Sequence, residues 1–319
     1  MDIIIQFILL ILGFAILAIC AEIFVDGARN IAYNFKIPAA IVGLTIVAFG
    51  TSAPEVSMSL FYVSTSHYDT VITNVLGSNI FNILVVIGVS ALISSLTVDK
   101  DLIKRDFPFL IISTIGLLII ACYYKKLIQI WGIIFLILIF AYIIYLVIKT
   151  KEDKKAMSEE IEDKFTIQKS ILYTLVGLIG IAIGSQLAGG STEFIADYYK
   201  LSGGIIGLTI VAIGTSLPEL ITSISALRKG EKGMVIGNVL GSSIFNILFI
   251  LGLSSIILPL PNNFLPINIK FLPHIFFMTI ITIVGAAFAY TQNEVDRKEG
   301  ILLILLYIAY LAFTRVYPI

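Results

Sequence analysis

Residues 50–55 read GTSAPE and residues 214–219 read GTSLPE, and each hexapeptide lies near the middle of a long apolar stretch. Each one places a proline, which removes a helical hydrogen bond, beside a glutamate, whose charge is costly in an apolar environment. A combination this unfavourable, found twice, indicates that both copies serve one purpose.

The composition around these motifs indicates a membrane protein. Of 319 residues, 58% are hydrophobic and only 13% are charged, and the mean hydropathy is +1.02. A soluble domain could not cover so much apolar surface, so we predict a polytopic protein embedded in a lipid bilayer. The formal net charge is zero, which gives no indication of nucleic-acid binding. Cys20 and Cys122 both lie in apolar runs, where we expect small packed side chains and not a disulfide or a metal site.

Apolar runs bounded by polar residues predict an all-α fold with ten transmembrane helices. We expect the first of them to be a true span, because no basic segment typical of a signal peptide precedes it. A polar segment at 149–169, with six lysines and six acids, separates a first unit (1–148) from a second (170–319), and we interpret it as a solvated linker. The approximate limits of the expected spans are 3–22, 37–66, 70–95, 107–124, 127–148, 168–189, 203–227, 233–258, 271–290 and 300–317.

The two units repeat each other at a constant offset of 164 residues. Residues 41–60 and 205–224 are identical at 13 of 20 positions, and residues 74–84 and 238–248 at 10 of 11. Each unit holds five expected spans, and five is odd, so the second unit must enter the membrane from the opposite side. The sequence therefore predicts two inverted repeats, an architecture common among secondary transporters.

The distribution of basic residues predicts the orientation. With the N-terminus outside, the loops on the inner side hold sixteen lysines and arginines, and those on the outer side hold five. The positive-inside rule then places both termini outside a cell membrane and the linker in the cytoplasm.

The motifs have the chemistry of a cation site. Pro54 and Pro218 leave the carbonyls of Gly50 and Gly214 without their helical donors, and carbonyl oxygens are ligands for sodium and calcium. Helical spacing places hydroxyls on the same face as each glutamate, and inversion would bring the glutamates together near the midplane of the membrane. These candidates are Thr51, Ser52 and Glu55 in the first motif and Thr215, Ser216 and Glu219 in the second.

Two further helices supply uncharged oxygens. Polar residues recur every four positions in the third and eighth expected spans, where they form stripes of amides and hydroxyls. We expect ion ligands at the inner members and capping or packing at the outer ones, although all could also hold helices together. The stripes are Asn74, Ser78 and Asn82, and Asn238, Ser242 and Asn246.

At these residues the chain resembles the sodium/calcium exchanger family, within the cation/calcium antiporter superfamily. The paired blocks at about 41–90 and 205–254 resemble the two alpha-repeats of that family, and the short linker is similar to that of prokaryotic members. The resemblance implies that Glu55 and Glu219 hold calcium together with the backbone oxygens of Thr51 and Thr215. The flanking sodium sites it implies use the carbonyls of Ala48 and Ala212, the region of Ser52 and Ser216, and the hydroxyls of Ser78 and Ser242. It also implies that Asn82 and Asn246 line the middle. Potassium-dependent relatives carry an aspartate at the position of Asn246, so we expect no potassium requirement here.

The predicted function is sodium/calcium exchange by alternating access. Calcium and sodium are then transported substrates, and we expect no cofactor, no enzymatic activity and no obligate protein partner. The resemblance implies three sodium ions per calcium, which would make exchange electrogenic, and implies that the first and sixth spans slide past the remaining core. A proton/calcium exchanger remains the nearest alternative, because two buried carboxylates could carry protons. An intramembrane aspartyl protease would need aspartates mid-span, and a passive channel would show flux without a counter-ion.

Overall fold

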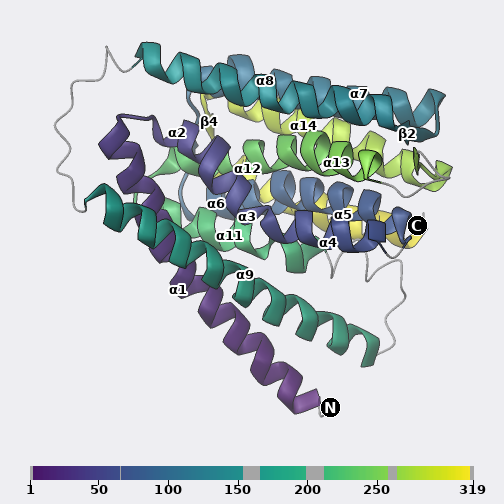
Figure 1. Ribbon diagram of the computed structural model, residues 1–319, viewed down its shortest axis with the longest axis horizontal. Helices are drawn as coiled ribbons and strands as arrows, with labels where there is room; N and C mark the ends of the chain where they lie inside the picture. The colour runs from purple at the N-terminus through teal and green to yellow at the C-terminus, as the bar shows by residue number, and fades with distance from the viewer. Residues whose placement is uncertain (1–2, 65, 154–165, 199–211, 258–263, 317–319) are drawn as a thin grey trace.

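A computed structural model describes residues 3–64, 66–153, 166–198, 212–257 and 264–316. These residues form a bundle of long helices (Figure 1). The first unit contains α1 (Ile3–Phe35), α2 (Ala39–Val42), η1 (Gly43–Val47), α3 (Ala48–Thr51), α4 (Ala53–Ser64), α5 (Tyr68–Phe81), η2 (Asn82–Val86), α6 (Ile87–Ile93), η3 (Leu102–Asp106), α7 (Phe107–Tyr123) and α8 (Gln129–Asp153). The second contains α9 (Ile167–Tyr198), α11 (Ala212–Arg228), α12 (Lys232–Phe245), η5 (Asn246–Ile250), α13 (Leu251–Ile256), η6 (Ile269–Phe271), α14 (Leu272–Gln292) and α15 (Arg297–Val316).

Within the described residues, seven helices are long and apolar enough to cross a membrane, or eight if the bent pair α2–α3 and α4 is one span. The predicted helical membrane fold is therefore confirmed, whereas the count of ten spans stays a prediction. Residues 203–211 of the expected seventh span lie outside the described residues, so α11 is seen only from Ala212.

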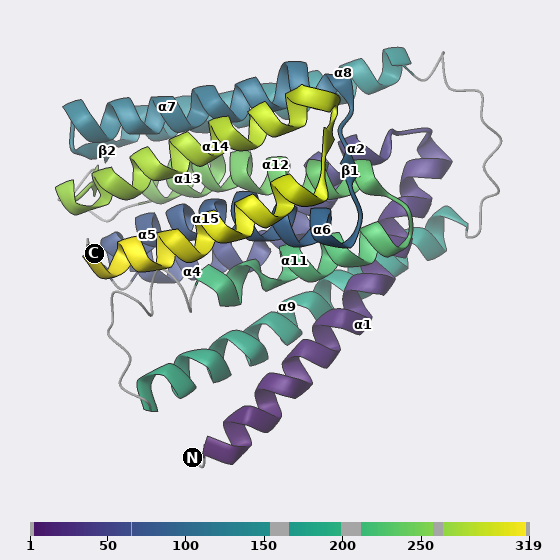
Figure 2. The same cartoon turned by 180° about the vertical axis from the view of Figure 1, so that it is seen from behind.

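The centre of the bundle is formed by the helices that carry the polar stripes. In the most apolar window of each span, 94% of residues are buried in α12–α13 and 78% in α5–α6, against 17% in α1 and 28% in α8. Helices α7, α8 and α14 lie on one side of this core, and α1 and α9 lie together on the other (Figures 1 and 2). The polar residues are thus removed from lipid, as an apolar solvent requires.

Helix α1 extends well beyond the expected end at residue 22. The charged residues that suggested a loop lie on its last turns and contact the turn between α11 and α12. Arg29 Nε lies 2.6 Å from Glu231 Oε1, Lys229 Nζ lies 2.7 Å from Asp26 Oδ1, and the Tyr33 hydroxyl donates to Glu231. Because these partners are provided by the second unit, the charges are compatible with a continuing helix.

Helices α1 and α9 touch at glycines. A Cβ atom on Gly13 would lie 2.6 Å from the backbone nitrogen of Ala188, and one on Gly177 would lie 2.6 Å from Phe24 Cα. Gly13 and Gly177 are separated by the repeat offset, so the two helices use equivalent positions to approach each other. Such contacts are typical of helix pairs in membranes, where small residues let backbones come close.

Two short strand pairs, which the hydropathy pattern did not predict, connect the units. Leu96 of β1 (Leu96–Thr97) pairs with Val295 of β4 (Glu294–Val295). Leu127 of β2 (Lys126–Ile128) pairs with Leu265 of β3 (Phe264–Pro266). Both pairs are antiparallel, and each joins one unit to the other.

Candidate cation-binding site

The two motifs face each other across the centre of the bundle. Glu55 lies in the first turn of α4 and Glu219 lies within α11, and neither side chain is exposed. The Ser216 hydroxyl donates to Glu55 Oε1 at 3.4 Å, and the Ser52 hydroxyl donates to Glu219 Oε1 at 3.2 Å. Both hydrogen bonds therefore cross between the motifs, because the helices are packed with these residues toward each other.

The backbone differs between the motifs. In the first, the helix breaks at Ser52 and the flanking segments are bent by 42°. In the second, α11 continues through Pro218. The carbonyl of Gly214, which Pro218 leaves without its helical donor, accepts a hydrogen bond of 3.4 Å from the Ser185 hydroxyl of α9.

Each polar stripe contacts the motif of the other unit. The Thr51 hydroxyl donates to Asn238 Oδ1 at 3.2 Å and lies 3.5 Å from the Ser242 hydroxyl of α12. In the same way, the Thr215 hydroxyl donates to Asn74 Oδ1 at 3.3 Å and lies 3.4 Å from the Ser78 hydroxyl of α5. The structure therefore brings motifs and stripes together in one buried cluster.

The backbone carbonyl of Ala48 belongs to this cluster. It lies 3.4 Å from the Thr51 hydroxyl and 3.4 Å from the Ser242 hydroxyl. Its repeat partner Ala212 is the first residue of α11, and the contacts of its side chain lie outside the described residues.

The amides at the outer ends of the stripes are fully engaged by the protein. Asn238 accepts from Thr51 and donates to the Ser223 hydroxyl at 3.1 Å. Asn74 accepts from Thr215 and donates to the Ser59 hydroxyl at 3.4 Å. These hydrogen bonds suit the two residues to holding the threonines in place. Ser59 and Ser223 were not among the sequence candidates, although they too are separated by the repeat offset.

Four buried oxygens of the candidate residues have no hydrogen-bond partner among the described residues. They are Glu55 Oε2, Glu219 Oε2, Asn246 Oδ1 and Asn82 Oδ1. A buried oxygen without a donor costs about 1–3 kcal/mol, and more when it carries charge. The unpartnered oxygens of the two facing glutamates fit a cation that prefers oxygen ligands, such as sodium or calcium.

The charge of this cluster comes from two glutamates alone. Within the part of the chain that the structure describes, no three His, Cys, Asp or Glu side chains come together as a metal site. The remaining donors are hydroxyls, amides and carbonyls, which coordinate a hard cation without adding charge. The cluster can therefore be neutralised by one divalent ion.

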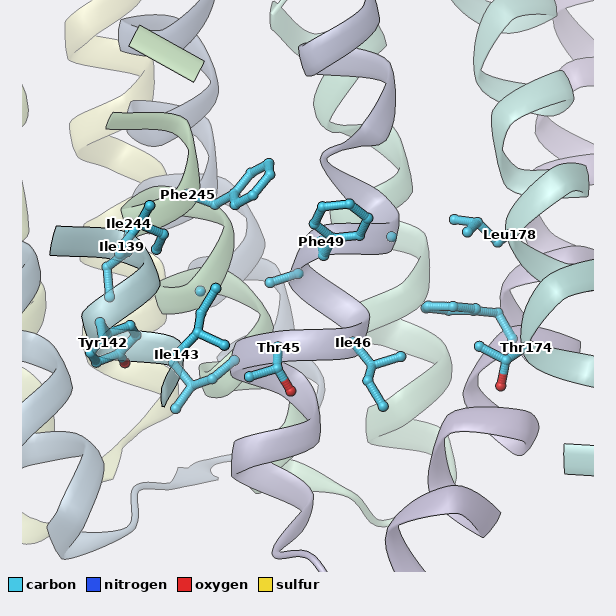
Figure 3. Close-up of a pocket in the computed structure, with 15 residues that line it drawn as sticks. Thr45, Ile46, Phe49, Ile139, Tyr142, Ile143, Thr174, Leu178, Ile244 and Phe245 are labelled. Atoms are coloured by element: carbon cyan, nitrogen blue, oxygen red, sulfur yellow. The ribbon is translucent and has the colours of Figure 1, made fainter. Parts of the chain in front are cut away.

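The nearby cavities have different chemistry. An apolar cavity of about 350 Å³ lies beside α3, with Phe49 between Phe245 on one side and Leu178 on the other (Figure 3). Its described lining includes no charged side chain, so it does not contain the two carboxylates of the cation site. A smaller cavity of about 170 Å³ adjoins Thr215 and is lined by Ser185 and Gln186 of α9.

A helical membrane bundle with two buried carboxylates in a shell of neutral oxygens defines a cation transporter. Residues 5–151 and 169–316 match the family described as sodium/calcium exchanger protein. The chain is 39% identical over 259 residues to the putative antiporter CaxA of Alkalimonas amylolytica, and this match covers 79% of this chain and 81% of that protein. It is 30% identical to the sodium/calcium exchanger MaX1 of Methanosarcina acetivorans, with 96% of this chain and 97% of that protein covered.

A solved structure of the sodium-calcium exchanger NCX_Mj, soaked with Na⁺ and Sr²⁺, superposes with a TM-score of 0.83 at 32% identity. The match covers 98% of this chain and 99% of that one. The chain belongs to the sodium/calcium exchanger family, and the resemblance inferred from the repeated motifs is confirmed. It is a membrane protein of the cation/calcium antiporter class.

Proposed function

We propose that this protein exchanges sodium for calcium at one site shared by its two repeats. The observation that carries this proposal is that each glutamate has one oxygen bonded to a serine of the opposite motif, while its other oxygen has no partner among the described residues. One calcium ion neutralises the two carboxylates. Sodium competes by occupying several positions together, which the hydroxyls of Ser78 and Ser242 and the carbonyl of Ala48 support. The transported ions are the substrates, and no cofactor takes part.

The architecture in this proposal is two inverted five-helix repeats, 1–148 and 170–319, joined by the linker at 149–169. Support comes from the strand pairs, each of which joins one repeat to the other. Helices α1 and α15 have their free ends toward one end of the bundle, whereas α8 ends and α9 begins toward the opposite end (Figure 1). The distribution of basic residues in the loops supports termini outside and a cytoplasmic linker.

Labelling tests this orientation. Replacing both native cysteines, Cys20 and Cys122, gives a background in which Ser158→Cys carries the only thiol. A membrane-impermeant thiol reagent should label this variant in permeabilised cells and not in intact ones. Equal labelling of intact cells would reverse the orientation.

Three sodium ions in exchange for one calcium would carry one net positive charge across the membrane in each cycle. A membrane potential then contributes about 2.3 kcal/mol per charge per 100 mV. Hydroxyl and amide ligands favour sodium over protons as the coupling ion, because a proton needs no such shell.

The test is calcium uptake into proteoliposomes loaded with sodium. Calcium uptake should depend on the outward sodium gradient and persist with a protonophore present. It should increase when a potassium–valinomycin potential makes the interior positive, because each cycle then moves its net positive charge outward. Uptake that responds only to a pH gradient would identify a proton/calcium exchanger instead.

A further inference from the structure

The second repeated block contains one departure from identity. Residues 74–84 and 238–248 agree at every position except one, where the first repeat has Asn79 and the second has Ser243. Both residues are buried, with side chains 2% and 1% exposed. Two helices that are otherwise equivalent therefore differ at a single position in the interior of the protein.

Asn79 links the two central helices. Its Nδ2 donates to the backbone carbonyl of Ser243 at 3.2 Å, and its Oδ1 accepts from Asn246 Nδ2 at 3.1 Å. A backbone carbonyl can only accept, so it fixes which end of the Asn79 amide faces it. The other end, Oδ1, can also only accept, and it therefore requires Asn246 to present its NH₂ group.

The consequence is a fixed orientation of the Asn246 amide. Its nitrogen is held by Asn79, and its Oδ1 is left buried and unpartnered among the described residues. Asn246 is the first residue of the π-helical segment η5, which packs against α4, the helix that carries Glu55. A wide π-helical turn is frequent at functional sites, where it places a side chain differently from a regular helix.

The equivalent position in the first repeat lacks this arrangement. Asn82 begins η2 as Asn246 begins η5, but both ends of its amide are buried without a partner in the described part of the chain, as is the Ser243 hydroxyl. The serine side chain is too short to provide the acceptor that Asn79 provides. Asn82 is therefore free to turn either end of its amide toward the site.

We propose that Asn79 is a positioning residue that holds Asn246 as a permanent oxygen ligand of the transported cation, while Asn82 remains adaptable. This inference rests on the proposed function. An amide oxygen attracts sodium or calcium, whereas an amide NH₂ repels them, so the orientation of Asn246 contributes directly to affinity. The site is consequently asymmetric even though its glutamates, serines and threonines are paired.

The first test is equilibrium calcium binding to purified protein, with sodium as the competitor. Asn79→Ala and Asn79→Ser should each weaken calcium binding or raise the sodium concentration for half-displacement by about two- to tenfold, because the Asn246 amide is no longer held. Ser243→Ala, the matched change in the other repeat, should alter neither value, because only its backbone carbonyl is used. Unchanged ion binding in both Asn79 variants, or an equal effect of Ser243→Ala, would overturn the inference.

Double variants separate positioning from packing. In an Asn246→Ala background, Asn79→Ala should produce no further change in ion affinity, whereas a purely structural loss would add to it. The exchange Asn79→Ser with Ser243→Asn should transfer the sensitivity, so that Asn82→Ala becomes more damaging than Asn246→Ala. Additive effects, or no transfer, would contradict the role of Asn79. If the unmodified protein bound no calcium, or bound calcium that sodium did not displace, the proposed function would fail first.

Discussion

The two motifs have almost the same sequence but different backbones. GTSAPE interrupts its helix at Ser52, whereas GTSLPE lies within a continuous α11. The first helices of the two units, α1 and α9, differ at one pair of equivalent positions. Ser185 of α9 donates to the Gly214 carbonyl, while the equivalent residue of α1 is Ala21, which has no side-chain donor. We infer that proline determines which hydrogen bond is lost, and that a donor from a packed helix helps the second motif to remain helical.

The side chains, in contrast, follow the repeat closely. Serine to glutamate, threonine to asparagine and threonine to serine contacts each occur twice, with the two units exchanged. A site that needs this symmetry should depend on both halves. A site held mainly by one half should tolerate changes in the other.

The largest expected effect comes from removing either carboxylate. Glu55→Gln and Glu219→Gln should each abolish sodium-driven calcium uptake, because each leaves a single charge to balance a divalent ion. Insertion and thermal stability should be retained, since a neutral amide is less costly in the membrane than a carboxylate. Glu22→Gln is the control, because this carboxylate is 56% exposed at the end of the bundle and should leave uptake near normal. Substantial uptake by one glutamine variant would show that the halves are not equivalent.

Replacing choline with potassium should change calcium uptake far less than the loss of a carboxylate. Uptake by the unmodified protein should be the same in potassium and in choline at constant ionic strength and clamped potential, because the site has only two carboxylates. A strict requirement for potassium would show that the interpretation of Asn246 is wrong.

Asn246→Asp should make exchange sensitive to pH. Only a protonated carboxyl can donate to Asn79 Oδ1, so activity relative to the unmodified protein should fall as pH rises, unless potassium restores it. Asn82→Asp is the matched variant and should respond less to pH, because no acceptor faces that position among the described residues. Parallel pH profiles of uptake for the two variants would remove this distinction between the halves.

The smallest effect concerns the helix through Pro218. Ser185→Ala removes the donor to the Gly214 carbonyl and should destabilise the protein by about 1 kcal/mol, lowering the unfolding midpoint by about 2 °C. Ser57→Ala, which removes an exposed hydroxyl that donates only to the Ala53 carbonyl of its own helix, is the control and should shift the midpoint little. Thermal unfolding of the detergent-solubilised protein measures both midpoints. An unchanged midpoint for Ser185→Ala would show that this hydrogen bond does not stabilise α11.

Much of the site could be predicted from the sequence, because repetition reveals function when helices are otherwise apolar. The glutamates, the hydroxyls beside them and the stripes were all identified by being duplicated at one offset. What could not be predicted depends on contacts between helices. Spacing placed Ser52 on one helix face with Glu55, but only packing shows that its hydroxyl donates to Glu219. Ser185 has no polar repeat partner and gave no signal, but Asn79 could have been found as the one difference in an otherwise identical block.

The fold shows the same division. Hydropathy predicted a helical membrane protein and approximated most helix limits. It ended the first helix too early, because Asp26 and Arg29 look like loop residues until their partners on the turn between α11 and α12 are known. It also missed the strand pairs, which depend on segments such as 96–97 and 294–295 meeting in space.

The central claim is that both repeats form one site that holds either calcium or sodium. Its most direct test is equilibrium binding of radioactive calcium to the purified protein during titration with sodium, choline or potassium. We predict one calcium per chain, displaced by sodium with a Hill coefficient clearly above unity, unaffected by choline or potassium, and absent from both Glu55→Gln and Glu219→Gln. Calcium that remains bound in excess sodium, or that binds normally after the loss of either glutamate, would contradict the account.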